Sequence, residues 1–350
     1  MTVVDPDAHY MEDTRQLAEY LPEPMRTRIG SASPSYLLSN SVGDRWVMGR
    51  ISRPEVNYPD AYSEPEEIPG IMKFLGVDIS VQLPNRMLQL STTGQKDVAV
   101  ALADGFARYM GDRVVNPAEG VYSMIIAPFQ DPPRAADIIY RHAQNPGMCA
   151  VCLITGGVSP PLGDTRYDPI YRAAQDVELP IVYHANGGSI DHFPIRGFQQ
   201  FLETHTLGFL FYNLATLTSM LVQGVPERFP RLRFAFQEAG LFYIPMLMHR
   251  LDAAYRKRRA EAPLLKHLPS EYMRDFRYGT QPMEEPNKEE HLEMIFEMID
   301  GPNTLVFSTD YPHWDYDLPS KITNLSFLSQ TDKEQILGGN ALNFYRFEGR

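Results

Sequence analysis

The sequence predicts an α/β fold, a single (β/α)₈ TIM barrel domain that spans residues 1–350. Eight short apolar runs bounded by Gly, Pro or polar turns recur along the chain, and stretches with helical periodicity lie between most of them. Runs such as AVCLIT and PIVYH are almost continuously hydrophobic, which is typical of parallel strands covered on both faces. Barrels of this kind reach this length as one domain. A doubly wound open sheet is the alternative, but no GxGxxG follows the first run, so a dinucleotide site is unsupported.

The individual elements follow from these two patterns. In chain order, strands are expected at residues 3–8, 77–83, 123–128, 149–155, 180–184, 232–238, 276–280 and 304–310. Helices with apolar residues at i, i+3 and i+4 spacing are expected at residues 98–110, 168–178, 214–230, 244–259 and 288–299. Gly or Pro follows several of the helical patterns closely, as at many helix ends.

One long insertion between the first two strands breaks this alternation. Residues 29–71 are rich in Pro, Tyr and acidic residues and show no clear periodicity. Long irregular insertions are often functional lids, and the aromatic content, including Trp46 and Tyr58, favours an ordered cap over a disordered segment. We therefore expect this cap to contact a bulky or ringed substrate.

The composition argues against several classes of partner and location. The formal net charge is −12 at pH 7, whereas nucleic acids and anionic membranes require clustered Lys and Arg. The start MTVVDPDAHY does not resemble a signal peptide, and no later stretch approaches the length of a membrane span. These features predict a cytoplasmic protein that acts on a small molecule. Cys149 and Cys152 form a CxxC inside an apolar run, where buried structural thiols are favoured over a redox or zinc motif.

Candidate ligands stand where the predicted strands end, the place where barrel enzymes carry their active sites. Period-two alternation along the first strand puts Asp7 and His9 on one face, and later strands end in His184, Glu238 and Asp310. Each residue alone has a structural explanation, such as a helix cap or a hydrogen-bonded core histidine. Their convergence on one barrel mouth predicts a divalent metal site, because carboxylates gathered without a cation repel one another.

Several motifs together resemble the amidohydrolase-related branch of the amidohydrolase superfamily. They are the D-x-H of the first strand, HANGG, STDYPH, VPERFPRLRFAFQEAG, MLMHRLDAAY, LPSEYMRDFRYGTQPMEEP and GGNALNFY, which extend over nearly the whole chain. The branch includes the amino-carboxymuconate-semialdehyde decarboxylase and γ-resorcylate decarboxylase types. The resemblance implies a metal-dependent barrel enzyme, often dimeric, in which Asp7, His9, His184 and Asp310 hold the ion.

The ion expected from this resemblance is zinc, with manganese or iron also compatible with mixed nitrogen and oxygen ligands. A second ion is possible, and Glu238 and His205 are additional candidate ligands. Three departures from the family pattern bear on the chemistry. Asp7 stands where His or Glu is common, Glu238 stands where the decarboxylases usually carry His, and strand four has no Lys to form a carbamate bridge.

Two reactions fit such a centre, and the strand-six carboxylate favours hydrolysis. In the hydrolytic reaction, metal-activated water attacks a carbonyl-type carbon, Asp310 relays the proton, His184 or a nearby donor stabilises the oxyanion, and Glu238 serves as general base or as ligand of a second ion. Nonoxidative decarboxylation of an aromatic or unsaturated acid is the first alternative. The second alternative is a barrel that binds ligands but has no catalytic activity. A structural alternative for Glu238 is an ion pair with Arg233 or Arg86.

Further candidates concern the substrate, expected to be a small carboxylate-bearing molecule. Arg86 follows the second strand and could clamp a carboxylate, although a solvated loop arginine is the structural alternative. Trp46 in the cap, and Tyr311 and His313 beside Asp310, are expected to contact substrate.

Overall fold

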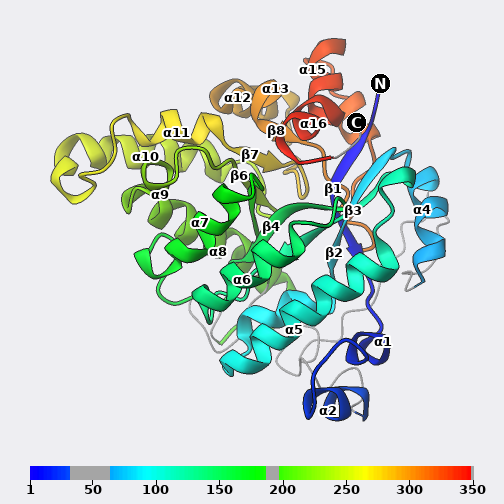
Figure 1. The fold of residues 1–350 in the computed structure, drawn as a ribbon. Helices are drawn as coiled ribbons and strands as arrows, with labels where there is room; N and C mark the ends of the chain where they lie inside the picture. Colours follow the sequence, from blue (N-terminus) through cyan, green and yellow to red (C-terminus); the bar gives the residue numbers. More distant parts are fainter. Residues whose placement is uncertain (32–63, 187–196, 348–350) are drawn as a thin grey trace.

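Eight parallel strands form one sheet in the order β1 to β8 in the computed structural model, which describes residues 1–31, 64–186 and 197–347 (Figure 1). The strands are β1 Val4–Tyr10, β2 Ile79–Pro84, β3 Val121–Ile126, β4 Met148–Ile154, β5 Ile181–His184, β6 Phe234–Gln237, β7 Arg277–Gly279 and β8 Leu305–Val306. Every neighbouring pair is parallel. The predicted eight-stranded barrel is confirmed, and each strand overlaps its expected range.

The last and first strands approach each other through backbone hydrogen bonds between the segment after β8 and β1. Asp310 N donates to Asp7 O at 2.8 Å, and His9 N donates to Tyr311 O at 2.7 Å. These bonds bring the two ends of the sheet together into a nearly closed barrel. We call this contact the β8–β1 seam.

The strand β8 is shorter than the sequence predicts, because side chains replace its expected backbone partners. Ser308 N donates to Thr280 Oγ1 at 3.1 Å, and Thr309 N donates to Asp5 Oδ1 at 2.9 Å. The next residue, Asp310, has a φ of 60°, which takes the backbone out of extended geometry. The ladder therefore ends early, and Asp310 is presented from a turn.

Helices surround the sheet on its outside (Figure 1). The α-helices are α1 Thr14–Ala18, α2 Met25–Ser31, α4 Ile68–Leu75, α5 Lys96–Tyr109, α6 Pro132–His142, α7 Asp168–Asp176, α8 Phe201–Val222, α9 Val225–Arg228, α10 Tyr243–Arg258, α11 Pro269–Asp275, α12 Glu289–Ile299, α13 Gly301–Thr304, α14 Ser320–Thr323, α15 Gln330–Glu334 and α16 Asn340–Phe344. The expected helix at 214–230 is in fact two, because Gly224, with a φ of 69°, separates α8 from α9.

The core lies between the strands and the helices that cover them. All seven residues of β1 and all seven of β4 are buried, as parallel strands covered on both faces require. On α7, Ile170, Tyr171, Ala173 and Ala174 form the buried stripe, and burying a side chain such as Ile170 contributes about 1.5–3 kcal/mol. The cysteines predicted to be structural, Cys149 and Cys152, are free and buried in β4, and burial raises the pKa of both thiols.

Most of the expected cap, including Trp46 and Tyr58, lies outside the described residues. The flanking parts that are described are helical: α2 covers residues 29–31, and the short 3₁₀ segment η1 (Pro65–Glu67) leads into α4. Within the described ranges, none of the helices combines the length and apolar character needed to cross a bilayer.

Candidate metal centre

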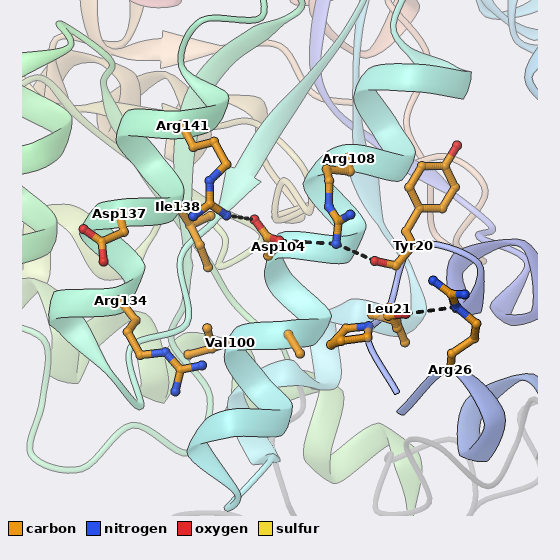
Figure 2. Close-up of a pocket in the computed structure, with 12 residues that line it drawn as sticks. Tyr20, Leu21, Arg26, Val100, Asp104, Arg108, Arg134, Asp137, Ile138 and Arg141 are labelled. Atoms are coloured by element: carbon orange, nitrogen blue, oxygen red, sulfur yellow. Dashed lines mark hydrogen bonds and ion pairs between the residues drawn. The ribbon is translucent and has the colours of Figure 1, made fainter. Parts of the chain in front are cut away.

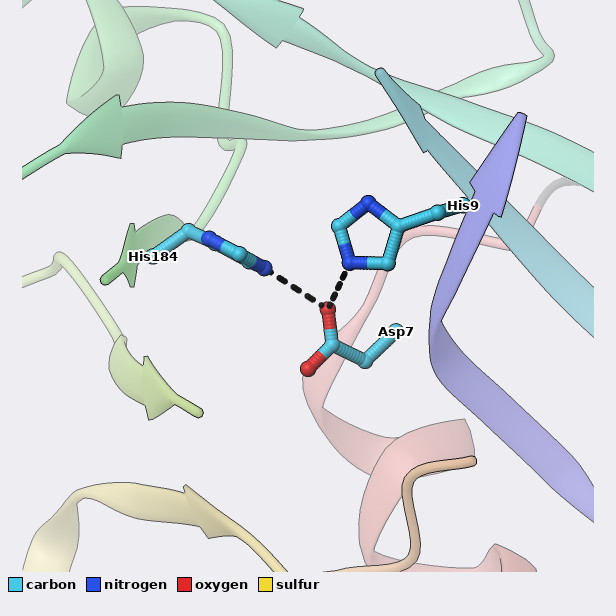
Figure 3. Close-up of side chains that lie close together, drawn as sticks. All are labelled: Asp7, His9 and His184. Atoms are coloured by element: carbon cyan, nitrogen blue, oxygen red, sulfur yellow. Dashed lines mark ion pairs between the residues drawn. The ribbon is translucent and has the colours of Figure 1, made fainter. Parts of the chain in front are cut away.

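Asp7, His9, His184 and Asp310, expected as ligands from the sequence, are brought together at the carboxyl ends of their strands. His184 Nε2 lies 3.1 Å from Asp7 Oδ1, and His9 Nε2 lies 3.8 Å from the same oxygen, so Asp7 stands between the two imidazoles (Figure 3). His9 Nε2 also lies 3.0 Å from Asp310 Oδ1. All four side chains are at most 1% exposed. Strands far apart in the sequence thus bring nitrogen and oxygen atoms together in two groups that share His9: Asp7 with His9 and His184, and His9 with Asp310 and His313.

Several buried atoms in or beside these two groups form no hydrogen bond with the described residues. They are both carboxylate oxygens of Asp7, the Nε2 atoms of His9 and His184, Oδ2 of Asp310 and Oε2 of Glu238. Buried polar atoms without partners are costly, so such a cluster requires a further group to satisfy it. Two imidazoles and two carboxylates are a donor set suited to a divalent zinc, manganese or iron ion. The residues present therefore fit the implied metal.

Backbone carbonyls orient both imidazoles toward the centre. His9 Nδ1 donates to Pro84 O at 2.9 Å, and His184 Nδ1 donates to Ala185 O at 2.5 Å. A carbonyl oxygen can only accept, so Nδ1 carries the proton in each ring and Nε2 keeps a free lone pair. This is the tautomer that metal-binding histidines adopt.

Asp310 is held as a carboxylate by a neighbouring imidazole. Burial alone would raise its pKa, but His313, with Nδ1 2.7 Å from Asp310 Oδ1, holds the pKa of Asp310 below its usual range. The other ring nitrogen of His313 lies 2.9 Å from Asn85 Oδ1. Although burial favours the neutral ring, the Asp310 carboxylate raises the pKa of His313.

His313 also belongs to a second cluster, with His9 and Asp310, whose ligand atoms lie within 4.8 Å of one another. Both of its ring nitrogens already face oxygen acceptors, on Asp310 and Asn85. We therefore place His313 beside the candidate ligands as the hydrogen-bond partner of Asp310.

Glu238 reaches the centre from the residue after β6, with a φ of 54°. Its Oε2 lies 3.5 Å from His184 Nε2, and the residue is 4% exposed. Burial first, and then the charges of Asp310, Asp7 and Asp315, raise the pKa of Glu238 well above its ordinary value. This environment favours a protonated carboxyl group.

The ion pair considered between Glu238 and Arg233 is not formed. Arg233 instead donates to the backbone carbonyls of Asn343 and Glu178. The second arginine considered, Arg86, opens the 3₁₀ segment η2 (Arg86–Thr92) and is partly exposed.

Other expected residues occupy different places. His205, on α8, lies with Nε2 3.4 Å from Asp315 Oδ2 and belongs to neither cluster of metal-capable groups found among the described residues. Tyr311 is fully buried, and its ring packs against Tyr316 at 5.3 Å.

Asn85 and Asp315 are site residues that sequence reasoning missed. Asn85 directly follows β2, so the strand-end rule that found His184 could also have found it. Asp315 lies in the loop after β8, five residues beyond Asp310, and burial raises its pKa. The HWD run that contains it carried no signal specific enough to separate it from an ordinary loop acid.

A cavity of about 420 Å³ lies away from this centre, between α5, α6 and the segment before α2 (Figure 2). Four arginines are among its lining residues. Two of them, Arg108 and Arg141, pair with Asp104, and Arg134 pairs with Asp97. Three of the four guanidinium groups thus have carboxylate partners, and Arg26 Nε donates to Leu21 O at 3.1 Å, so we do not assign the catalytic site to this cavity.

Comparisons with solved structures show the same fold. An amidohydrolase, map2389c, from Mycobacterium avium subsp. paratuberculosis K-10 is 19% identical, with a TM-score of 0.76 and 98% of each chain covered. The 5-carboxyvanillate decarboxylase LigW from Sphingomonas paucimobilis is 21% identical, with a TM-score of 0.67 and 99% of each chain covered. A dihydroxybenzoic acid decarboxylase from Polaromonas sp. JS666, with bound manganese and the inhibitor 2-nitroresorcinol, is 16% identical, with a TM-score of 0.66, 99% of this chain and 97% of that chain covered.

The family is established by the sequence itself. No curated protein matches the chain. The amidohydrolase family profile, however, matches residues 4–347, which is nearly the whole barrel and includes every residue of the metal centre described above. The match agrees with the motifs at the strand ends and with a centre that gathers two imidazoles and two carboxylates. The chain therefore belongs to the amidohydrolase family and is a metal-dependent enzyme.

Proposed function

We propose that this enzyme catalyses the nonoxidative decarboxylation of a small aromatic or unsaturated acid. The observation that carries the proposal is the environment of Glu238, a buried carboxyl group beside His184 whose pKa is raised well above its ordinary value. Sequence alone favours hydrolysis, because a carboxylate in this position suits a general base. A carboxyl group that retains its proton suits the opposite task, which is to donate a proton to carbon.

Two further observations support the proposal. Burial is the largest cause of the raised pKa of Glu238 and does not depend on the charges of the neighbouring carboxylates. Solved structures with the same fold include decarboxylases of 5-carboxyvanillate and of 2,6-dihydroxybenzoate. The substrates of those proteins are ringed acids, the class expected here from the aromatic content of the cap.

The reaction divides into two roles for the described side chains. A divalent ion held by Asp7, His9, His184 and Asp310 would supply the positive charge that binds the substrate's carboxylate and an adjacent oxygen. The bond to the carboxylate breaks, carbon dioxide leaves, and the carbon keeps the electron pair. Glu238 gives its proton to that carbon and then takes a proton from water.

Isotopes distinguish decarboxylation from hydrolysis in the wild-type enzyme. Protein loaded with zinc or manganese is incubated in D₂O with a panel of hydroxylated benzoic acids and unsaturated acids. We expect one carbon dioxide per turnover and one deuterium on the product carbon, and metal-stripped protein serves as the control. Turnover in H₂¹⁸O that places ¹⁸O in the product without releasing carbon dioxide would overturn the proposal.

Hydrolysis remains the second candidate function for one specific reason. Glu238 directly follows β6, at a position where decarboxylases of the related branch usually carry His, and a metal-bound ionised carboxylate there would suit water activation. A homodimeric state, a cytoplasmic location and zinc as the native ion stay predictions.

A further inference from the structure

We propose that Glu12 is a positioning residue that holds two histidines of the metal centre in place through the segment at residues 84–87. The inference rests on the metal centre of the proposed function. Glu12 is 1% exposed and lies just beyond β1. Its Oε2 accepts from Asn85 N at 3.0 Å and its Oε1 accepts from Met87 N at 2.5 Å. One carboxylate thus holds both ends of the turn that follows β2.

The clamped turn contacts two imidazoles of the site. Pro84 O accepts from His9 Nδ1 at 2.9 Å, which directs His9 Nε2 toward Asp7 and Asp310. The adjacent Asn85 Oδ1 lies 2.9 Å from Nε2 of His313, whose other nitrogen contacts Asp310. Pro84 therefore orients the candidate ligand His9. Asn85 orients His313, which is the hydrogen-bond partner of the candidate ligand Asp310.

A purely structural turn does not require this arrangement. A buried carboxylate without a cationic partner is costly, and among the described residues Glu12 forms no ion pair. Backbone N–H groups, including that of Arg86, partly offset this cost. Asn or Ser side chains cap such turns without a buried charge. A carboxylate has two acceptor oxygens, so one side chain can accept from the backbone N–H groups of both Asn85 and Met87.

A second buried carboxylate provides a matched control. Asp252 on α10 is 7% exposed, and it accepts from Ser270 N at 3.0 Å and Ser270 Oγ at 2.8 Å. It also holds a backbone turn, at the start of α11, and lies 3.8 Å from Arg256 Nη2, and neither Ser270 nor Arg256 belongs to the metal centre. Asp252→Asn therefore reproduces the structural loss without the proposed positioning effect.

The test compares Glu12→Gln with Asp252→Asn. Chelator competition measures the dissociation constant for Mn²⁺ or Zn²⁺. Spectra that correlate ¹H with ¹⁵N record the imidazole ring signals of the metal-free protein, and thermal unfolding gives Tm. We expect Glu12→Gln to weaken metal binding about 10–100-fold and to shift the ring signals of His9 and His313. Asp252→Asn should lower Tm and leave both other readouts unchanged. If Glu12→Gln lowers Tm alone, its role is structural and the proposal fails.

Asn85→Ala keeps the test decisive should Glu12→Gln not fold. It removes the contact with His313 and leaves the backbone carbonyl that holds His9. We expect the ring signal of His313 to shift and that of His9 to stay, and an unshifted His313 signal would overturn the proposal. Wild-type protein that binds no ion would refute the proposed function. The positioning role would still be tested in that case, because the ring signals are recorded on metal-free protein.

Discussion

Replacing Glu238 with Gln tests whether this residue is the proton donor. Gln keeps the size of the side chain and one of its oxygens, but an amide does not transfer a proton to carbon. A positioned general acid contributes about 10²–10⁴-fold to a rate, or about 2.7–5.4 kcal/mol of the activation barrier. We expect kcat to fall within that range. Metal affinity should change little, because Glu238 belongs to neither cluster of metal-capable groups found among the described residues.

The raised pKa of Glu238 also fixes the sign of two pH effects. The proton donor is the acid form, so activity should fall as pH rises through the raised pKa. In metal-free protein, the stability associated with this group is fully present below its ordinary pKa of 4.5 and is lost as pH rises through the folded-state value. Gln does not ionise, so the metal-free variant should unfold at a higher temperature than wild type at alkaline pH.

Carbon dioxide release by the metal-loaded proteins and calorimetry of the metal-free proteins provide the two assays. Glu238→His is the informative companion, since it supplies the imidazole that decarboxylases of the related branch usually carry at this position. We expect it to retain more activity than Glu238→Gln. A Gln variant that decarboxylates at the wild-type rate would show that another group delivers the proton, and the reasoning from burial to function would be refuted.

Three other predictions concern the site and its surroundings. Asp310→Asn removes a carboxylate from the centre, and we expect purified protein to hold less than about a tenth of the wild-type metal by elemental analysis; full occupancy would contradict the assignment. Asp104→Asn should lower Tm at neutral pH, because the hydrogen bond from His142 and the nearby arginines lower the pKa of Asp104. That stabilisation is present above the ordinary pKa of 3.8 and is lost as pH falls through the lowered value, so a Tm difference that does not shrink as pH falls below 3.8 would refute it. Gly240→Ala places a Cβ 2.5 Å from Glu284 Oε1 at a φ of 78°, and urea titration should show a loss of about 1–3 kcal/mol; an unchanged midpoint would refute the clash.

The parts of the site that depend on local rules could be predicted from the sequence. Alternation along one strand was enough to put Asp7 and His9 on the same face, and the end of an apolar run located His184. Helical periodicity fell short for the first half of α8, because Leu202 and Leu207 are exposed while Thr204 is buried, so no apolar stripe marks its inner face.

Contacts between distant segments could not be predicted in this way. The partners of Glu12 lie 73 and 75 residues further along the chain, so only the folded barrel shows that this acid holds the turn after β2. The protonation tendency of Glu238 likewise depends on burial and on charges carried by other strands. Strand-end position identified this residue, but its tertiary surroundings determine whether it acts as an acid or a base.

The β8–β1 seam imposes an order on the maturation of the enzyme. Thr309 and Asp5 are hydrogen-bonded across 304 positions of sequence, and Asp310 and Asp7 meet at the same junction. During synthesis Asp310 emerges long after Asp7 and His9, so the proposed set of ligands is complete only once the segment after β8 has been made. An ion held there would link β1 to that segment, and metal binding and resistance of the β8–β1 seam to opening should rise together.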